Sequence, residues 1–170
     1  MKKVVLIAAG SLVVLLLLAG GLIYMTHRSH LPPELRGTSF SVYYPRRLPS
    51  GWAVQPTTAG RTGNLVSFTL INAGSGQNVL VTEGPQDKSF NPSGVDSALS
   101  NTVSLSLPYG AGRAGERPTV PVDAPADIRA ADKPAKYAYV LTNDNVLIQV
   151  SSSAASTTTI QLLLQSFAKG

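Results

Sequence analysis

The stretch NLVSFTLINAGSGQNVLVTE, residues 64–83, decides the fold class of this chain. Apolar residues largely alternate with polar ones in both halves, and a Gly-Ser-Gly turn separates the halves. Two alternating runs joined by a short Gly-rich turn predict an antiparallel β-hairpin with one buried face. The side chains expected on that face are Val66, Phe68, Leu70, Val79 and Val81.

A second hairpin is expected closer to the C-terminus. Residues 135–142 alternate large and small side chains, Asn-Asp-Asn follows as a turn, and residues 146–150 return as a strand. The Gly- and Pro-rich segment 108–132 predicts irregular backbone, because Pro is excluded from central strands. Segment 57–63 is expected to be a turn. Shorter strands are predicted at residues 39–44, 52–54 and 104–107.

Two segments have the spacing of amphipathic helices. Asn91-Pro92 is typical of a helix start, and Val95, Leu99 and Val103 follow four residues apart. Near the C-terminus, apolar residues at 160, 163, 164 and 167 would form one helix face. The predicted class is therefore α+β: an antiparallel sheet of about six to seven strands packed by two amphipathic helices.

An apolar segment precedes these elements. Residues 4–25, VVLIAAGSLVVLLLLAGGLIYM, carry no charge. A bilayer-spanning helix needs about 20 mainly apolar residues, so the segment predicts one N-terminal transmembrane helix. A cleaved signal peptide is the alternative, although its apolar region is usually about 7–15 residues long. Lys2 and Lys3 favour a cytoplasmic N-terminus.

This helix would divide the chain into four parts. They are a cytoplasmic tip at residues 1–3, the transmembrane helix at 4–25, a juxtamembrane linker at 26–38 and an extracytoplasmic α+β domain at 39–170. The expected location is the cell membrane, in a single-pass topology with the C-terminal domain outside the cytoplasm. The lipid bilayer is then the partner of residues 4–25.

Composition excludes several classes of function. The chain of 170 residues has no Cys, which excludes disulfides, thiolate metal sites and a cysteine nucleophile. Its net charge of +5 is concentrated near the apolar segment. From residue 31 onward, eleven Lys or Arg face nine Asp or Glu without a basic stripe, so nucleic acid is not expected as a partner.

No catalytic, metal or cofactor site is predicted. Gly110-x-Gly112-x-x-Gly115 matches the dinucleotide-binding spacing, but Pro118 and Pro121 leave no room for the helix that the motif requires. Both His precede residue 31, so no histidine triad is expected in the domain. A Ser–Lys dyad would need a buried lysine, and a carboxylate pair would need two acids across a cleft. The residues concerned are Lys88, Lys133, Lys136, Glu83, Asp87, Glu116, Asp123, Asp127 and Asp132.

One cluster is a candidate ligand contact. Arg46 and Arg47 precede Trp52, and such a group can bind phosphate or acidic glycan through bidentate contacts and stacking. The alternative is a solvated Arg pair beside a tryptophan that packs in the core.

The motif F-x-V-x-Y-P-x-x-L-P-x-G-W at residues 40–52 and the closing run 164–167, LQSF, carry a resemblance. The chain resembles uncharacterised bacterial single-pass membrane proteins with an extracytoplasmic domain of unknown function. Its layout is also similar to PsbP-like and Mog1-like α+β domains. The similarity covers residues 39–85 and 137–167, and segment 108–136 departs from it. The resemblance implies a binding or accessory role and supplies no catalytic residues.

The expected function is a membrane-tethered, non-catalytic binding or accessory module of the bacterial cell envelope. Its partner would be an unknown envelope protein or glycan. Two alternatives stay open: a structural subunit of a surface or secretion assembly, and a cell-envelope enzyme of Ser–Lys or carboxylate type.

Overall fold

The computed structural model describes residues 31–118 and 134–170. The predicted transmembrane helix at residues 4–25 lies outside these residues. Within the described ranges, no helix has the length and apolar character needed to cross a membrane.

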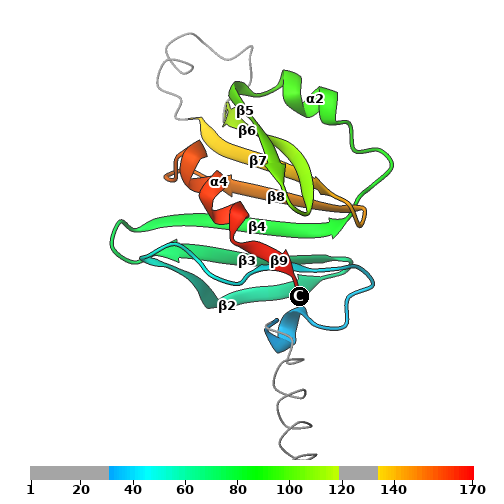
Figure 1. The fold of residues 1–170 in the computed structure, drawn as a ribbon, viewed down its shortest axis with the longest axis vertical. Helices are drawn as coiled ribbons and strands as arrows, with labels where there is room; N and C mark the ends of the chain where they lie inside the picture. The colour runs from blue at the N-terminus through cyan, green and yellow to red at the C-terminus, as the bar shows by residue number, and fades with distance from the viewer. Residues whose placement is uncertain (1–30, 119–133) are drawn as a thin grey trace, which may run out of the picture. The chain divides into compact units, whose positions relative to one another are not determined.

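A seven-stranded antiparallel sheet forms the body of the domain (Figure 1). Its strand order is β2-β3-β4-β8-β7-β6-β5. The strands are β2 (Trp52–Thr62), β3 (Leu65–Asn72), β4 (Gln77–Pro85), β5 (Ser100–Leu107), β6 (Gly110–Arg117), β7 (Ala135–Thr142) and β8 (Val146–Ser152). Both predicted hairpins are confirmed: β3 pairs with β4, and β7 pairs with β8.

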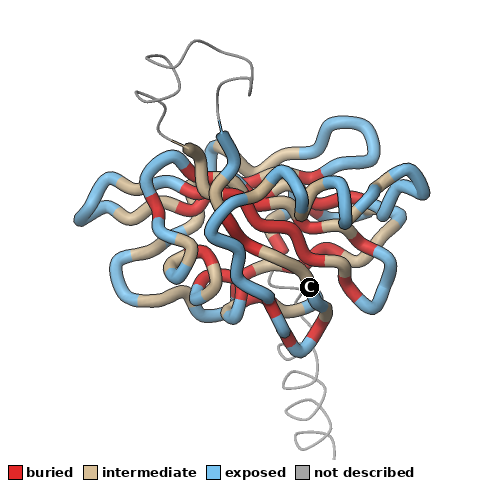
Figure 2. The backbone as a smooth tube through the Cα atoms, turned by 90° about the horizontal axis from the view of Figure 1, so that it is seen from above, coloured by how far each residue is buried: buried red, intermediate tan, exposed pale blue. Residues whose placement is uncertain are grey.

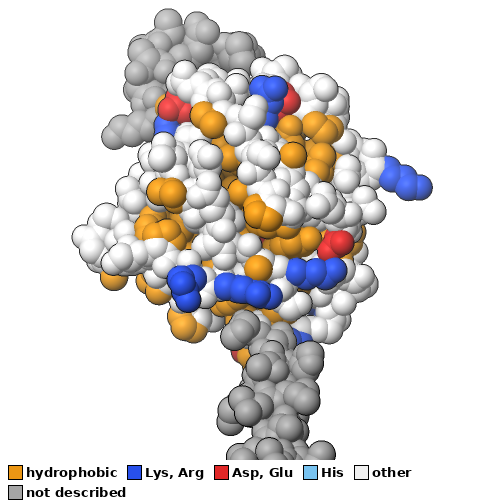
Figure 3. Space-filling view, viewed as in Figure 1, with side chains coloured by type: hydrophobic (Ala, Val, Ile, Leu, Met, Phe, Trp, Pro, Cys, Tyr) orange, Lys and Arg blue, Asp and Glu red, His pale blue; other side chains and the backbone are white. Residues whose placement is uncertain are grey.

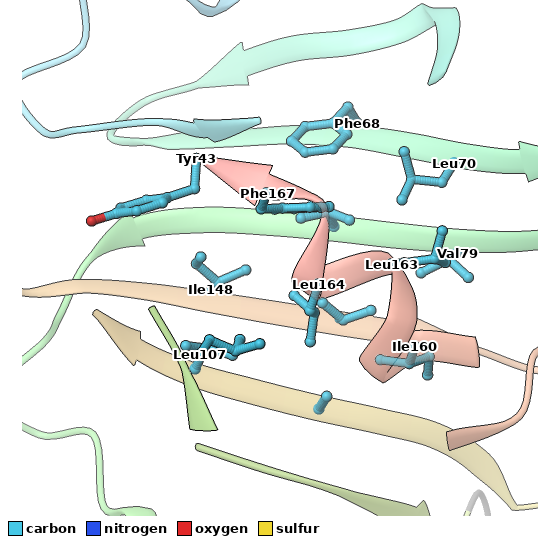
Figure 4. Close-up of a cluster of buried hydrophobic side chains, with 14 of the residues drawn as sticks. Tyr43, Phe68, Leu70, Val79, Leu107, Ile148, Ile160, Leu163, Leu164 and Phe167 are labelled. Carbon is cyan, nitrogen blue, oxygen red and sulfur yellow. The ribbon is translucent and has the colours of Figure 1, made fainter. Parts of the chain in front are cut away.

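One face of the sheet is covered by the C-terminal helix and by a two-stranded ribbon. Helix α4 (Thr157–Gln165) runs directly into β9 (Phe167–Lys169), which pairs with β1 (Tyr43–Pro45). The main core lies between these elements and the sheet, and Figure 2 shows the buried backbone running through the middle of the domain. Figure 4 shows side chains of α4 and β9 meeting those of β3, β4 and β8 there.

Helix α4 forms where its sequence provides both a cap and an apolar face. The Ser156 side chain accepts a hydrogen bond from the Thr159 backbone N–H and so satisfies one free donor of the first turn. Ile160, Leu163 and Leu164 are almost fully buried, whereas Leu162 on the other side is 51% exposed. The spacing of these residues explains why the sequence predicts a helix here, although Phe167, which was expected on the same helix face, lies in β9.

The α+β prediction is wrong. Strands hold 52% of the described residues and helices 14%. The expected second amphipathic helix is α2 (Pro92–Ser97), which has six residues and buries none of them. Val103 lies in β5 instead, because Val and Thr favour strands and Leu105 and Leu107 continue a period of two.

Two segments expected to be irregular are strands. Strand β2 continues through residues 57–62 across a bulge between Gln55 and Gly60. Strand β6 occupies residues 110–117, within the segment expected to be loop. Strand β6 lies between β5 and β7. Its glycines are typical of a loop, but here the close approach of β6 to β7 requires them.

The segment just before β1 also contributes to the core. Leu35, in the 3-10 helix η1 (Pro33–Leu35), is fully buried, and Leu31 is 9% exposed. Residues 31–38, expected to belong to a linker, thus contain two core side chains.

Candidate functional site

The structure does not gather the Arg46, Arg47 and Trp52 candidates into a site. Arg46 and Arg47 are exposed just after β1, and Arg46 donates hydrogen bonds to the carbonyls of Ser166 and Lys169. Trp52 begins β2 and packs, partly buried, against the core. Figure 3 shows Lys and Arg side chains in a row on the α4 face. None of the three candidates lines the groove described below.

Two of the candidate catalytic residues form an ion pair with each other. Lys136 is engaged by Glu116 in an ion pair, and this pairing lowers the pKa of Glu116. Glu83 is fully buried beneath β1. Lys133, Asp123, Asp127 and Asp132 lie outside the described residues. Within the described ranges, no group of three His, Cys, Asp or Glu residues is placed to hold a metal ion.

The GxGxxG run has a packing role in β6. A Cβ atom on Gly112 would lie 1.8 Å from the Tyr139 carbonyl oxygen, and one on Gly110 would lie 2.3 Å from that of Leu141. These contacts are impossible for any other residue, so both glycines allow β6 to approach β7. A Cβ atom on Gly115 would lie 3.2 Å from the Cβ of Leu99, so Gly115 leaves room for Leu99 to pack against β6.

A groove on the sheet face opposite α4 is the strongest candidate site. Segment 86–99 leaves β4 and reaches β5 at the far edge of the sheet, and it must therefore pass β8, β7 and β6. The groove lies between this segment and the sheet, with a volume of about 800 Å³. Ligand sites for small molecules typically occupy about 300–1,000 Å³.

The walls of this groove are mainly apolar. Its floor contains Leu65, Leu147 and Tyr137, from β3, β8 and β7. Its other wall comes from segment 86–99, through Phe90, Val95, Ala98 and Leu99. Leu65 is 49% exposed, so part of this apolar surface is open to solvent.

Segment 86–99 is held in place by contacts with Tyr139 and Arg113. Tyr139 alternates with the core residues Ala138 and Val140, so its side chain points to the face opposite α4. Its hydroxyl donates to Asp96 at 2.8 Å, its ring meets Phe90 edge-on at 5.4 Å, and Asp96 pairs with Arg113 at 3.1 Å. The groove wall is thereby fixed to the sheet.

Opposite charges mark the two ends of the groove. Arg117, at the end of β6, lies with its guanidinium 5.8 Å from the centre of the Tyr137 ring. Asp87 follows Pro85 by two residues, and Pro85 pairs with Val146 at the start of β8. Arg117 lies close to the level of Ser152, at the end of β8. Six residue steps along β8 separate these two levels, which is about 20 Å.

The two charged groups differ in their bonding. The Asp87 carboxylate accepts the backbone N–H of Ser89 at 2.7 Å, and this bond lowers the pKa of Asp87. No carboxylate of the described residues forms an ion pair with Arg117, whereas Arg113 and Lys136 nearby are both paired. The Arg117 guanidinium makes a cation–π contact with Tyr137, and its N–H groups can donate to an anionic group.

This groove is not predicted from the sequence. Its lining comes from five strands and a connecting segment, and only the pairing order of the strands brings these residues together. One usable signal was present: Phe90, Val95 and Leu99 are large apolar residues in a polar segment. The sequence predicts Val95 and Leu99 on one helix face with Val103, whereas the structure places them with Phe90 in the wall of the groove.

No protein-family model, curated protein or solved structure matches the chain. The resemblance to bacterial single-pass membrane proteins and to PsbP-like and Mog1-like domains therefore stays a prediction.

Proposed function

We propose that this chain is a membrane-tethered, extracytoplasmic binding module, and that the groove between segment 86–99 and the sheet is its ligand site. The uncharged segment 4–25 supports the tether, and Lys2 and Lys3 support an outward-facing domain. The observation that carries the binding role is the groove itself, a mainly apolar concavity of ligand size.

Binding without catalysis is the role that fits the lining residues best. The carboxylate among them, Asp87, has a lowered pKa, which makes it a weak proton acceptor near neutral pH. The positive guanidinium of Arg117 can serve as an anchor for an anionic group. These groups can orient a ligand, and the apolar walls can exclude water from it.

A photoreactive ligand tests the binding role in the full chain, reconstituted in bilayer discs. The probe is a diazirine derivative of lauryl alcohol, which has no charge, and labelled peptides are mapped by mass spectrometry. Labelling is expected on peptides that contain Leu147 and Tyr137. Labelling confined to residues 4–25 would contradict the proposal.

A matched pair of variants completes this test. Ala98 lines the groove and is exposed, so Ala98→Trp fills the groove without disturbing the core. Ala53 is also exposed but lies in β2 away from the groove, so Ala53→Trp is the control. Labelling at Leu147 should fall in the first variant and persist in the second; equal labelling in both would refute the groove as the ligand site.

A further inference from the structure

We infer that the ligand of this groove is an anionic amphiphile, with its acidic head group on Arg117 and its apolar chain along the Tyr137–Leu147–Leu65 floor. This inference rests on the proposed binding role of the groove. It adds the chemical class of the ligand and the direction in which the ligand lies.

The assignment of an acidic head group follows from the exposure and the contacts of Arg117. Its guanidinium is exposed and lies over the Tyr137 ring, and it has no acidic partner among the described residues. Guanidinium N–H groups match carboxylate and phosphate oxygens in a bidentate geometry. A ligand with such a head group would supply the counter-charge that Arg113 and Lys136 obtain from Asp96 and Glu116.

The orientation of the ligand in the groove follows from the negative charge of Asp87. Asp87 lines the groove and follows Pro85, whose backbone is about 20 Å along the strands from the level of Arg117. An anionic head group is attracted by Arg117 and repelled by Asp87, so the two residues together favour one orientation. The stretch between them is lined by Leu147, Val95 and Leu99, which suit an aliphatic chain.

The charge of the head group is tested with three photoreactive probes that share one chain: lauric acid, lauryl alcohol and lauryl amine. Each is applied at matched bilayer content to the full chain in discs. Labelling at Leu147 by the acid is expected to exceed that by the alcohol about tenfold or more, the usual effect of one hydrogen bond to a charged group. The amine is expected to label less than the alcohol.

Two arginine variants provide the decisive comparison. Arg117→Gln should reduce labelling by the acid to the level of the alcohol, whereas Arg47→Gln should leave it unchanged. Arg47 is equally exposed but lies beyond β1, away from the groove. A lauryl phosphate probe then shows whether phosphate or carboxylate is the better head group.

The outcomes separate this inference from the proposed function. Equal labelling of the groove by all three probes would overturn the anionic head group and leave a groove that binds apolar ligands. Absence of groove labelling by every probe would overturn the proposed function itself. Loss of the acid preference in Arg47→Gln, with Arg117→Gln unaffected, would place the anion site at the Arg pair and refute the inference.

Discussion

Glu83 Oε2 accepts a hydrogen bond from the Tyr43 backbone N–H at 2.8 Å, while Oε1 of the same buried carboxyl has no partner among the described residues. This contact joins β4 of the main sheet to β1 of the small ribbon. Because burial disfavours the charged form, the pKa of Glu83 is raised well above its ordinary value, despite the opposing effect of the Tyr43 bond. The carboxyl also raises the pKa of Tyr109, which is already raised by burial.

The raised pKa of Glu83 predicts that the domain loses stability as the pH rises. The folded state binds a proton that the unfolded state has released, so this contribution is complete below the unfolded pKa of Glu and declines between the unfolded and folded values. Within that window the free energy of unfolding should fall by up to about 1.4 kcal/mol per pH unit. Glu83→Gln keeps an acceptor for Tyr43 and removes this slope.

Urea unfolding of the wild type and of Glu83→Gln from pH 5 to pH 9 measures the effect. The two curves should diverge with rising pH, with the variant the more stable at pH 8. Parallel pH dependences would show that Glu83 is not the group responsible.

Gly112→Ala should destabilise the domain strongly, because its Cβ would lie 1.8 Å from the Tyr139 carbonyl oxygen. Forcing β6 away from β7 is expected to cost about 3 kcal/mol or more. Gly60→Ala is the matched control, since an added Cβ there meets nothing within 4 Å. Chemical unfolding of both variants checks the difference; similar stabilities would mean that β6 does not approach β7 so closely.

Helix α4 offers a comparison within a single element. Leu164→Ala removes a side chain that is 1% exposed and should cost about 2–5 kcal/mol. Leu162→Ala, on the exposed side, should change the free energy of unfolding by less than about 0.5 kcal/mol. Equal losses in both variants would contradict the packing of α4 on the sheet.

The proposed topology predicts that a tag after Gly170 lies outside the cytoplasm. Protease applied to intact cells, or to spheroplasts where an outer layer shields the membrane, should remove the tag and spare a cytoplasmic control protein. A tag that survives in spheroplasts until the membrane is opened would place the domain in the cytoplasm and refute the tether proposal.

Local patterns in the sequence predict part of this fold. The alternation in residues 64–72 and the apolar spacing in residues 160–164 depend on nearest neighbours, and the structure has the expected strand and helix there. Phe167, expected at the end of that helix, lies in β9. The same reasoning fails for Gly110, Gly112 and Gly115, because glycines near prolines are typical of loops. Their role depends on β7 and Leu99, which sequence spacing does not bring to them.

The candidate site illustrates the same limit. Arg46 and Arg47 are a candidate contact because they lie close to Trp52 in sequence, yet the structure leaves both on the surface away from the groove. Arg117 and Leu65 are far apart in sequence and become neighbours of one groove through the strand order β3-β4-β8-β7-β6. Strand order is a property of the whole sheet, and no single segment encodes it.

The most direct test of the groove as a ligand site uses a unique cysteine, which the chain allows because it has no other. Ala98→Cys places a thiol in the groove, and Ala53→Cys places one in β2. The rate of maleimide modification is measured for the full chain in bilayer discs, with and without added laurate. The account predicts that laurate slows modification at position 98 severalfold and leaves position 53 unchanged; equal rates at position 98 with and without laurate would contradict it.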